Sequence, residues 1–474
     1  MTHALIWLRR DLRLADNSAL QAALENGLRP VPVYLHDTST GTGGAASHWW
    51  LHHSLDALQR ELRSRGSDLL ILAGDSRVQL PSLARACNAS HVFWNRRYEP
   101  AEAAQDAALK AALGDSGIVV QSFAGNLLRE PWTLAKRDGT PYRVFTPFYR
   151  RGCKALEVRQ PLPVPANLKL DSDTRPDGHD ERPILPAFPW FEDEDQRWQP
   201  GEQGARAALE TFLSSGLDIY AEARDRPDLD GVSRLSPHLH FGEISPHQVR
   251  AAVLEHGGGE DDESVDKFFS ELGWREFSAH LLYHWPEITD DNLQKKFDRF
   301  PWEDDEDLQR AWQEGATGYP IVDAGMRQLW RTGYMHNRVR MITASFLVKN
   351  LLQDWRAGAR WFWKSLLDAD LANNSASWQW VAGCGADAAP YFRIFNPVTQ
   401  GRKFDARGDY VRQYVPELGR LPDRYVHCPW EAPDHVLESA GVSLGKDYPR
   451  PIVDLAKSRE RALDAFNSLM SRAS

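Results

Sequence analysis

Short apolar runs and segments of helical periodicity alternate along the first 125 residues. The apolar runs are bounded by polar or turn-forming residues, as β-strands are, at positions 4–8, 32–35, 69–72, 91–94 and 118–123. Between these runs, apolar residues recur every three or four positions, which predicts helices at 18–25, 48–65, 80–87 and 101–113. Strands that are apolar throughout and alternate with helices predict a doubly wound parallel sheet, a Rossmann-like α/β fold.

Two details refine this expectation. Asp16 and Asn17 precede the first predicted helix and can cap it. No GxGxxG motif follows the first strand, so the common dinucleotide-binding fingerprint is absent. The carboxyl edge of a doubly wound sheet still remains the place where a ligand would bind.

The pattern changes after residue 125. Residues 126–203 are rich in proline and show little periodicity, which is typical of an inter-domain connector that runs over the surface. Beyond them helical periodicity dominates, at 205–214, 245–255, 264–283, 307–313, 321–332, 337–352, 356–367, 373–381 and in a last helix from Pro451. We therefore expect an α/β domain (1–125), a connector (126–203) and an all-helical domain (204–474).

Composition narrows the class of protein. The chain has 474 residues, of which 42% are hydrophobic and 26% charged, as in a globular protein of two domains. No apolar run reaches membrane-spanning length, and the first residues lack the features of a signal peptide. The four cysteines are far apart and form no CxxC pair, which argues against disulfides or a zinc site and favours the cytoplasm. The net charge of −10 argues only weakly against nucleic-acid binding, because the distribution of charge matters more than its sum.

Tryptophan is unusually frequent, with 18 residues in the chain, and eight of them lie between positions 302 and 380. A core does not need so many indole rings, because each buried ring must also place its N–H group. Indole offers a flat face on which a nucleobase or flavin can stack, and a ring that can give up an electron. The distribution therefore indicates a site for stacking, for electron transfer, or for both.

Three predicted helices carry polar and aromatic side chains at spacings that place them on one face. They are Glu271, Trp274 and Arg275 on the first helix, Asn337, Arg340 and Met341 on the second, and Asp370, Asn374 and Trp378 on the third, with Asp368 just ahead and Trp380 two beyond. A fourth stretch, residues 233–236, is a turn before a helix, where hydroxyl and unpaired N–H groups could bind a phosphate.

Each of these features has an ordinary structural explanation when taken alone. A Glu–Arg pair on a helix is usually solvated, a single tryptophan usually belongs to the core, and a serine before a helix is usually a cap. Three such faces within about 110 residues instead indicate a polar ligand, because buried charges and amides need partners. His240 and His336 have no second ligand at metal spacing and nothing marks Cys384 as reactive, so structural roles are expected there.

Six longer motifs resemble the photolyase/cryptochrome family. They are WLRRDLRLADN, RLSPHLHFGEIS, ELGWREF, GYPIVDAGMRQLWRTGYMHNRVRMITASFLVKNLL, DADLANNSASWQWVAGCGADAAPYFRIFNPVTQGRKFD and DYPRPIVD. The resemblance covers essentially the whole chain, is strongest over residues 265–416, and is greatest to the bacterial photolyases that act on cyclobutane pyrimidine dimers. It implies an antenna-binding role for the α/β domain and an FAD-binding, catalytic role for the helical domain.

FAD is the cofactor that the resemblance implies. Its pyrophosphate would be held by Tyr220, Ser233, Leu235 and Ser236, and it would also contact Val232, Arg234 and Phe268. Its rings and ribose would be surrounded by Glu271, Arg275, Asn337, Arg340, Asp368, Asp370 and Asn374. The family often has Thr-Ser where this chain has Val232-Ser233, so one hydroxyl contact is lost. Asn374 would lie beside flavin N5, where an amide favours the fully reduced flavin that is active in repair.

The substrate that the resemblance implies is DNA containing a cyclobutane pyrimidine dimer. Glu271 and Asn337 would hydrogen-bond the damaged bases, and Trp274, Trp380 and Met341 would form the walls of the pocket. The dimer would flip out of the duplex, which costs least for damaged bases. Excited FADH⁻ would donate one electron to the dimer, the ring would split, and the electron would return.

Further roles follow from the same resemblance. Trp302, Trp355 and Trp378 fall at the positions of the family's electron-transfer chain. Trp378 and Trp380 are about 200° apart on a helix, so one can face that chain and the other the DNA. Contacts to the DNA backbone are expected from Arg338, Arg393, Arg402 and Lys403. A second chromophore would bind between the domains of a monomer: methenyltetrahydrofolate is the first expectation, and a deazaflavin or FMN are alternatives.

Three other functions are weighed against this one. A cryptochrome-type blue-light receptor is disfavoured by Asn374 and by the short segment that follows PRPIVD. A (6-4) photolyase is disfavoured because that branch commonly has a histidine pair in the region of Asn337 and Met341. An electron-transfer flavoprotein without a role on DNA would not need both Trp274 and Trp380.

Overall fold

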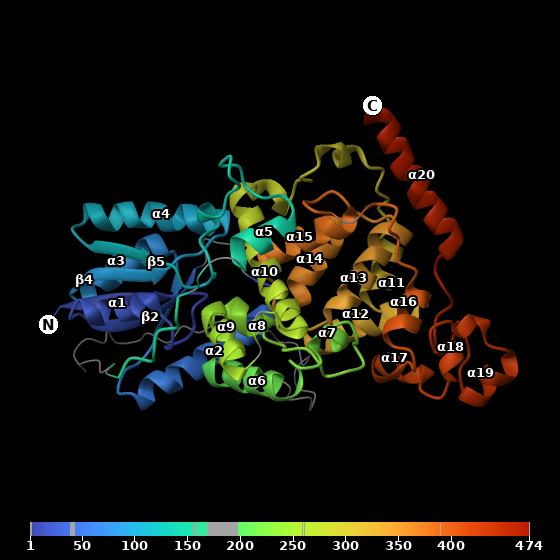
Figure 1. The fold of residues 1–474 in the computed structure, drawn as a ribbon, viewed down its shortest axis with the longest axis horizontal. Helices are drawn as coiled ribbons and strands as arrows, with labels where there is room; N and C mark the ends of the chain where they lie inside the picture. Colours follow the sequence, from blue (N-terminus) through green and yellow to red (C-terminus); the bar gives the residue numbers. More distant parts are fainter. Residues whose placement is uncertain are drawn as a thin grey trace.

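The computed structural model describes residues 2–37, 43–154, 157, 159–166, 168, 198–257, 259, 261–388 and 390–473. An α/β domain lies at the N-terminal end and a larger helical part at the other, with the last helix along the outer edge (Figure 1). In this part of the chain, no helix is both long enough and apolar enough to cross a membrane.

The α/β domain contains a parallel sheet of five strands in the order β3-β2-β1-β4-β5. The strands are β1 (His3–Leu8), β2 (Arg29–Asp37), β3 (Leu70–Gly74), β4 (Ala89–Asn95) and β5 (Val119–Phe123). The helices are α1 (Ser18–Glu25), α2 (Ala45–Ser64), α3 (Ser76–Ala86) and α4 (Pro100–Asp115). The predicted fold class is confirmed, and the predicted cap of the first helix is Asn17, whose side chain accepts from Leu20 N at 3.1 Å.

Alternate residues of β1 show how both faces of the sheet are covered. Ala4, Ile6 and Leu8 pack in one cluster with α1 and α2. Leu5 and Trp7 pack in another cluster with α3 and α4. This arrangement explains why the strands are apolar at every position. The strand order reverses between β1 and β4, so the carboxyl ends of these two strands flank the place where such sheets bind ligands.

The first part of the predicted connector differs from a purely surface-bound segment. It contains η1 (Pro131–Thr133), α5 (Phe145–Phe148) and a π-helical turn, η2 (Tyr149–Cys153). Aromatic side chains of α5 and η2 are buried in the same cluster as the long helix α10 (Glu263–His284). Much of the remaining connector lies outside the described residues.

The helical part follows the predicted pattern with added short elements. Before α10 come α6 (Glu202–Ser215), α7 (Tyr220–Ala223), α8 (Ser236–Phe241) and α9 (Pro246–His256). After it come η5 (Pro286–Thr289), η6 (Lys295–Arg299), α11 (Glu306–Gln313), α12 (Pro320–Thr332), α13 (Asn337–Ser345), η7 (Phe346–Asn350), α14 (Trp355–Ser365) and α15 (Leu371–Ala382). The chain ends with α16 (Pro397–Phe404), α17 (Asp409–Tyr414), η8 (Pro416–Leu418), α18 (Asp423–Val426), η9 (Pro429–Glu431), α19 (Asp434–Ala440) and α20 (Leu455–Ala473).

Several predicted helix boundaries are wrong; the helix predicted at 80–87, for example, is α3 and already begins at Ser76. Two other boundaries have a clear physical cause. The segment predicted as one helix over 337–352 ends its α-helical part at Ser345 and continues as the wider π-turn η7. The last helix begins at Leu455 and not at Pro451, because Ile452 N donates to Thr317 O and Asp454 accepts from Lys457 N. Both segments are fixed by tertiary hydrogen bonds or packing that periodicity alone does not reveal.

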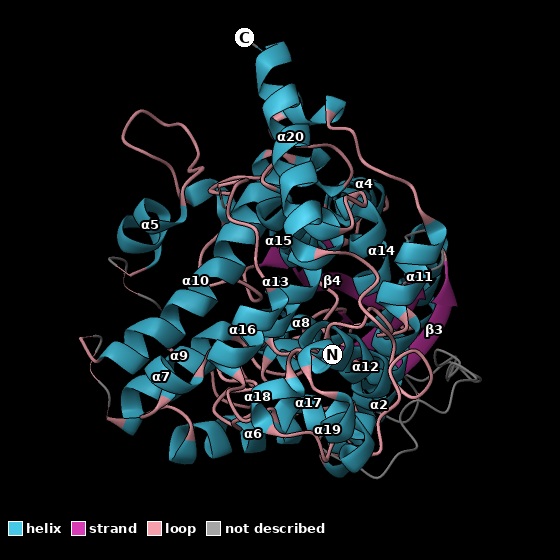
Figure 2. Ribbon diagram, turned by 90° about the vertical axis from the view of Figure 1, so that its right-hand side faces the viewer, coloured by secondary structure: helices cyan, strands magenta, loops and turns pink. Residues whose placement is uncertain are grey.

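The helix α15 connects two hydrophobic cores of the helical part. Its first half contributes Ala372 to the cluster of α10, and its second half contributes Trp378 and Val381 to the cluster of α12, α13 and α14. It contacts α10, α13 and α14 directly. Figure 2 shows these helices grouped in front of the strands of the sheet. The helix α15 therefore connects the two helices, α10 and α13, that carry the other predicted polar faces.

Candidate functional site

The face of α10 presents a carboxylate, an indole and a guanidinium. Glu271 forms an ion pair with Arg224 at 2.8 Å. Burial raises the pKa of the Glu271 carboxyl, and the charge of Arg224 opposes that rise. Trp274 is partly buried and stacks face to face on Phe145. Arg275 has only its sequence neighbour Glu276 as an ion-pair partner among the described residues, at 3.3 Å, so its guanidinium retains donors for a ligand.

The face of α13 begins with a capping histidine. His336 Nδ1 accepts from Arg338 N at 3.2 Å, which is the structural role expected for it. Arg340 donates to Asp368 at 2.8 Å and to Met335 O at 2.7 Å. Asn337 is exposed although His336 and Val339 beside it are buried, so its amide is accessible to a ligand. Met341 is partly buried.

The start of α15 is held by a charged cluster. Asp370 caps the helix by accepting from Asn373 N at 2.9 Å. Arg10 Nη1 and His240 Nδ1 lie 3.7 and 3.5 Å from Asp370 Oδ2. Burial alone would raise the pKa of Asp370, but the interactions with His240 and Arg10 outweigh it and lower that pKa. One turn later, the Asn374 amide donates to Ala359 O at 3.0 Å, which fixes its orientation.

The turn before α8 is unusual in its backbone. Arg234 has φ +52°, a left-handed conformation that is uncommon for a residue with a side chain. Ser233 Oγ accepts from Leu235 N at 3.4 Å, and Leu235 precedes the first helical residue, the exposed Ser236. Val232 packs on the edge of the α10 cluster, which also contains Tyr220 and Phe268.

The donor set of these elements fits FAD. Arg234 Nε and His336 Nε2 are buried and have no hydrogen-bond partner among the described residues. Ser236 and Asn337 are exposed beside buried neighbours. Unpaired N–H donors near the start of a helix can bind a pyrophosphate. The accessible amide of Asn337 and the ion pair of Arg340 with Asp368 can bind the polar edge of a heteroaromatic ring. Of the residues predicted for the cofactor, the structure places Arg275 and Asp370 in one pocket and pairs Arg340 with Asp368.

The three predicted electron-transfer tryptophans lie on adjoining segments. Trp378 on α15 is buried and packs on Phe362 of α14, at 5.0 Å between ring centroids. Trp355 is the first residue of α14, fully buried, with its N–H donated to Asn292 Oδ1 at 3.0 Å. Glu303 N donates to Leu352 O, which places the partly buried Trp302 beside the segment that leads into α14. Trp380 is partly buried, whereas Trp378 belongs to the core, as expected for opposite sides of one helix.

The residues predicted to contact DNA lie on or near α16. Arg338 pairs with Asp225 at 2.7 Å, and its guanidinium lies 4.5 Å from the ring of Phe404. Arg402 and Lys403 are exposed on α16, where Arg402 also approaches Glu431 at 3.4 Å. Arg393 is exposed in the preceding loop.

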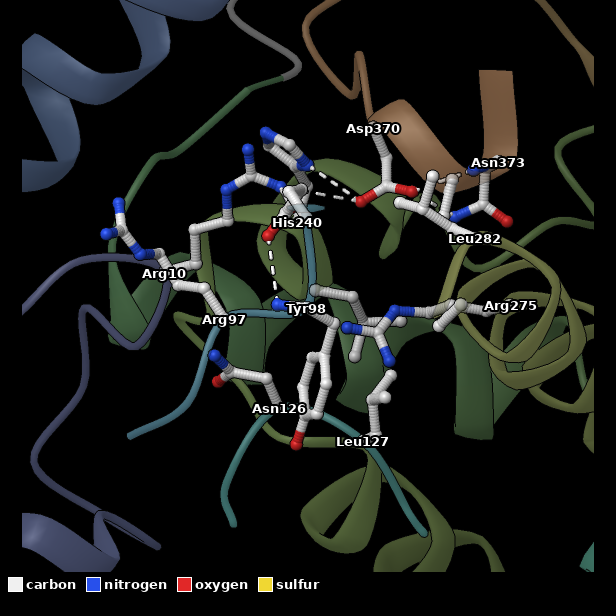
Figure 3. A pocket seen from close by; sticks show the side chains of 14 residues that line it. Arg10, Arg97, Tyr98, Asn126, Leu127, His240, Arg275, Leu282, Asp370 and Asn373 are labelled. Carbon is white, nitrogen blue, oxygen red and sulfur yellow. Dashed lines mark hydrogen bonds and ion pairs between the residues drawn. The ribbon is translucent and has the colours of Figure 1, made fainter. Parts of the chain in front are cut away.

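A pocket lies where the two domains meet, at the carboxyl ends of β1, β4 and β5 (Figure 3). Its α/β side is formed by Arg10, Arg97, Tyr98, Glu99, Asn126 and Leu127. Its helical side is formed by Leu239, His240, Arg275, Ala279, Leu282, Asp370, Ala372 and Asn373. Arg275 and Asp370 are among the residues predicted for the cofactor, so the pocket adjoins that site.

Sequence reasoning missed several residues that the structure places here. Arg224 and Asp225 pair with Glu271 and Arg338, and the adjacent opposite charges after Tyr220 were the only signal for them. Arg10 lies in the motif WLRRDLRLADN but was assigned no role, and Phe145 was assigned to the connector. Within the described residues, no group of three His, Cys, Asp or Glu side chains could hold a metal ion.

Comparison with known proteins agrees with this geometry. Residues 4–166 match the family model described as DNA photolyase, and residues 268–468 match the FAD binding domain of DNA photolyase. A deoxyribodipyrimidine photo-lyase of Agrobacterium fabrum is 50% identical over 98% of this chain and 97% of its own length. Cryptochrome-1 of Arabidopsis thaliana is 37% identical over 98% of this chain and 70% of its own length.

Solved structures give the same result. A bacterial class III photolyase from Agrobacterium tumefaciens has a TM-score of 0.94 and 49% identity, covering 99% of this chain and 98% of its own. An archaeal photolyase from Sulfolobus tokodaii, solved with two FAD molecules, has a TM-score of 0.80 and 29% identity over 98% and 100% of the two chains. The match to the FAD binding domain assigns FAD to the helical part. By sequence, by fold and by the polar faces of its helices, this chain belongs to the DNA photolyase family.

Proposed function

We propose that this protein is a light-driven DNA repair enzyme, a deoxyribodipyrimidine photo-lyase that splits cyclobutane pyrimidine dimers. One observation carries the proposal: α15, which carries Asn374 and Trp380, contacts both α10, which carries Trp274, and α13, which carries Asn337. The relative from Agrobacterium fabrum, 50% identical, has that enzyme name. Plant cryptochromes match at lower identity, 37% for cryptochrome-1.

The cofactor would be held by the residues already described. When bound, reduced FAD supplies the electron that blue light makes available. The turn at residues 233–236 offers donors to the pyrophosphate, and Arg340 with Asp368 offers a fixed charged pair. Asn374, oriented by its bond to Ala359, would be the amide nearest the flavin ring. Arg275 would use donors that Glu276 leaves unpaired.

The substrate would be a dimer flipped out of DNA. Glu271, held by Arg224, and the accessible amide of Asn337 would hydrogen-bond the damaged bases. Trp274, Trp380 and Met341 would pack against them, and stacking on an aromatic ring is worth roughly 1–3 kcal/mol per base. Arg338, Arg393, Arg402 and Lys403 would bind the phosphate backbone around the lesion.

Electrons from the surface would reach the flavin through Trp302, Trp355 and Trp378. The supporting observation is the continuity of their segments: Trp302 lies beside the residues that precede Trp355, and α14 contacts α15, which carries Trp378. The buried position of Trp355 and Trp378 keeps water away from two of the three rings.

We also propose an antenna chromophore in the α/β domain, methenyltetrahydrofolate first, with a deazaflavin or FMN as alternatives. The pocket at the carboxyl ends of β1 and β4 supports this, because its arginines could bind acidic groups of a folate or FMN. We propose a monomer that works in the cytoplasm, where four free cysteines remain reduced. An absorption spectrum of the purified protein would identify the antenna by a band beyond those of flavin.

The decisive experiment is a repair assay. Purified protein with reduced flavin is mixed in the dark with an oligonucleotide that contains one thymine dimer, and is then exposed to blue light. We expect dimers to disappear only in the light, and a Trp380→Ala variant to bind and repair poorly while it keeps its flavin. Binding of flavin without repair of the dimer would contradict the proposal. Repair of a (6-4) lesion but not of the dimer would identify the protein as a (6-4) photolyase.

A further inference from the structure

A glycine in the middle of α10 has a specific packing role. Gly273 precedes Trp274, and glycine in a helix interior weakens the helix relative to alanine. A Cβ atom at Gly273 would lie 2.6 Å from Cδ2 of Tyr149 and 3.5 Å from Cε2 of Phe145. The absence of a side chain therefore makes room for the Tyr149 ring of η2, whereas the Phe145 ring of α5 would lie at ordinary van der Waals distance.

These two rings and Trp274 form a parallel stack. The centroids of Phe145 and Trp274 are 3.7 Å apart with an interplanar angle of 7°. The centroids of Phe145 and Tyr149 are 5.6 Å apart with an angle of 11°. Residues 145 and 149 are four positions apart across the junction of α5 and η2, so they project from one side of that segment.

Hydrogen bonds hold the stack in place. The Tyr149 hydroxyl donates to Asp266 Oδ1 at 3.0 Å, and Asp266 also accepts from Lys154 Nζ at 2.6 Å. Phe145 N donates to Asp387 Oδ2 at 3.1 Å, in the loop after α15. Phe145 covers one face of the indole, so only the opposite face and the edges of Trp274 can contact a base.

We propose that Phe145 is a positioning residue for lesion recognition. By stacking on Trp274, it holds the indole plane in the orientation against which a flipped pyrimidine dimer packs. The inference rests on the proposed function, in which Trp274 is a wall of the lesion pocket. It adds a residue that lies more than a hundred positions away in sequence, in a segment that joins the two domains.

The test compares two phenylalanines of α5. Phe145→Leu removes the ring on Trp274, whereas Phe148→Leu is the matched control, because Phe148 is fully buried and packs on Phe277 and His280. Both flavin-loaded variants are titrated in the dark with dimer-containing and undamaged oligonucleotides. We expect Phe145→Leu to weaken binding of the dimer roughly threefold to tenfold, the range of an aromatic pair. Binding of undamaged DNA and the rate of flavin photoreduction should not change.

Two further variants exclude a mere loss of stability. Phe145→Tyr keeps a ring on the indole and should restore dimer binding. Gly273→Ala improves the helix propensity of α10 but displaces the Tyr149 ring, so it should weaken dimer binding while α10 itself is not weakened. If Phe148→Leu lowers dimer affinity as much as Phe145→Leu, or if Gly273→Ala binds the dimer as the wild type does, the inference is wrong.

A Trp274→Ala variant separates this inference from the proposed function. Weak dimer binding in Trp274→Ala with normal binding in Phe145→Leu overturns the role of Phe145 and leaves the proposed function intact. Normal dimer binding in both variants overturns the role of Trp274 and with it the inference. A wild-type protein that does not distinguish damaged from undamaged DNA overturns the proposed function itself.

Discussion

The α/β domain and the helical domain use polar side chains in opposite ways. In the α/β domain, the terminal nitrogens of Arg13 in the RRDLR motif bind protein groups alone. Arg13 is fully buried and donates to the carbonyl oxygens of Gly242, Asp16 and Gly125 at 2.7–3.0 Å. In the helical domain, Asn337 stays exposed and Arg275 has only its neighbour Glu276 as an ion-pair partner in the described part of the chain.

The difference shows that the partners of a polar side chain, and not its polarity alone, separate a structural role from a ligand-binding role. Both regions have dense polar motifs in the sequence. Of the acceptors of Arg13, Gly125 O lies at the end of the α/β domain and Gly242 O lies just after α8 in the helical domain. Arg13 therefore joins the two domains. The approach is close, since a Cβ atom at Gly242 would lie 1.9 Å from Arg10 O. The open groups of α10 and α13 instead leave donors and acceptors for a cofactor.

Replacing Arg13 is the strongest test of this comparison. Arg13→Met leaves three buried carbonyl groups without a donor, so we expect the free energy of unfolding to fall by about 3–5 kcal/mol. The loss should be similar with and without flavin, because Arg13 does not belong to the cofactor site. Denaturant unfolding of both forms measures it. Arg85→Met, an exposed arginine on α3, is the control and should change stability by about 0.5 kcal/mol or less.

Replacing Arg340 tests the polar groups of the helical domain that are proposed to bind the cofactor. Arg340→Met removes the partner of Asp368, whose side chain is only 5% exposed, and a donor proposed for the cofactor. We expect flavin affinity to fall by about 2–4 kcal/mol, measured as flavin retained after dialysis. The control is Arg327→Met on α12, an arginine as exposed as Arg340; the substitution breaks an ion pair with Glu417 at 2.6 Å and should leave the flavin bound. Equal flavin loss in both variants would contradict the comparison.

The buried carboxyl of Glu276 on α10 allows the role of partners for a buried charge to be tested by pH. Burial raises its pKa to about 7, because Arg275 and the backbone N–H groups of residues 128 and 129 compensate the charge only in part. The unfolded carboxyl loses its proton near pH 4.3, so between about pH 4.3 and 7 the folded state binds more protons. Stability contributed by this group therefore falls as pH rises through that window.

The Glu276→Gln variant should lack this dependence. Relative to the wild type, we expect its free energy of unfolding to increase by about 2–3 kcal/mol between pH 5 and pH 8. Denaturant unfolding at several pH values measures the difference. The exposed Glu25→Gln on α1 serves as control and should follow the wild type at every pH. If the free energies of unfolding of Glu276→Gln and the wild type differ by the same amount from pH 5 to pH 8, the folded protein keeps this carboxyl ionised over that range.

Periodicity was sufficient for the architecture. It predicted the five strands and the long helices because apolar spacing records which face is buried, and the first helix was predicted at its observed bounds, Ser18–Glu25. It failed where tertiary contacts decide the backbone. The π-turn at Phe346–Asn350 and the burial of Phe145 in the connector depend on partners distant in sequence.

The candidate site was predictable to a different degree. Residues on one helix, such as Glu271 and Trp274, were found because spacing places them together. Arg224, Asp225 and Phe145 were missed because their partners lie on other elements, and no spacing rule connects them. The roles given to the site residues stay predictions, because each role is defined by a contact with the cofactor or the substrate.

The smallest expected effect concerns the surfaces of the two domains. Arg402 and Lys403 are exposed on α16, near Arg338, and an exposed cation contributes to DNA binding mainly by releasing counterions from phosphate. Replacing both with Gln should reduce the slope of log affinity against log salt by about 1–2 and weaken binding about threefold to tenfold at moderate salt. Arg85 and Lys110, exposed on α3 and α4, form a charge-matched control pair whose replacement should leave the slope unchanged. If both pairs change the slope equally, DNA binding follows net charge, and the distinction between a DNA-facing helical surface and a passive α/β surface does not hold.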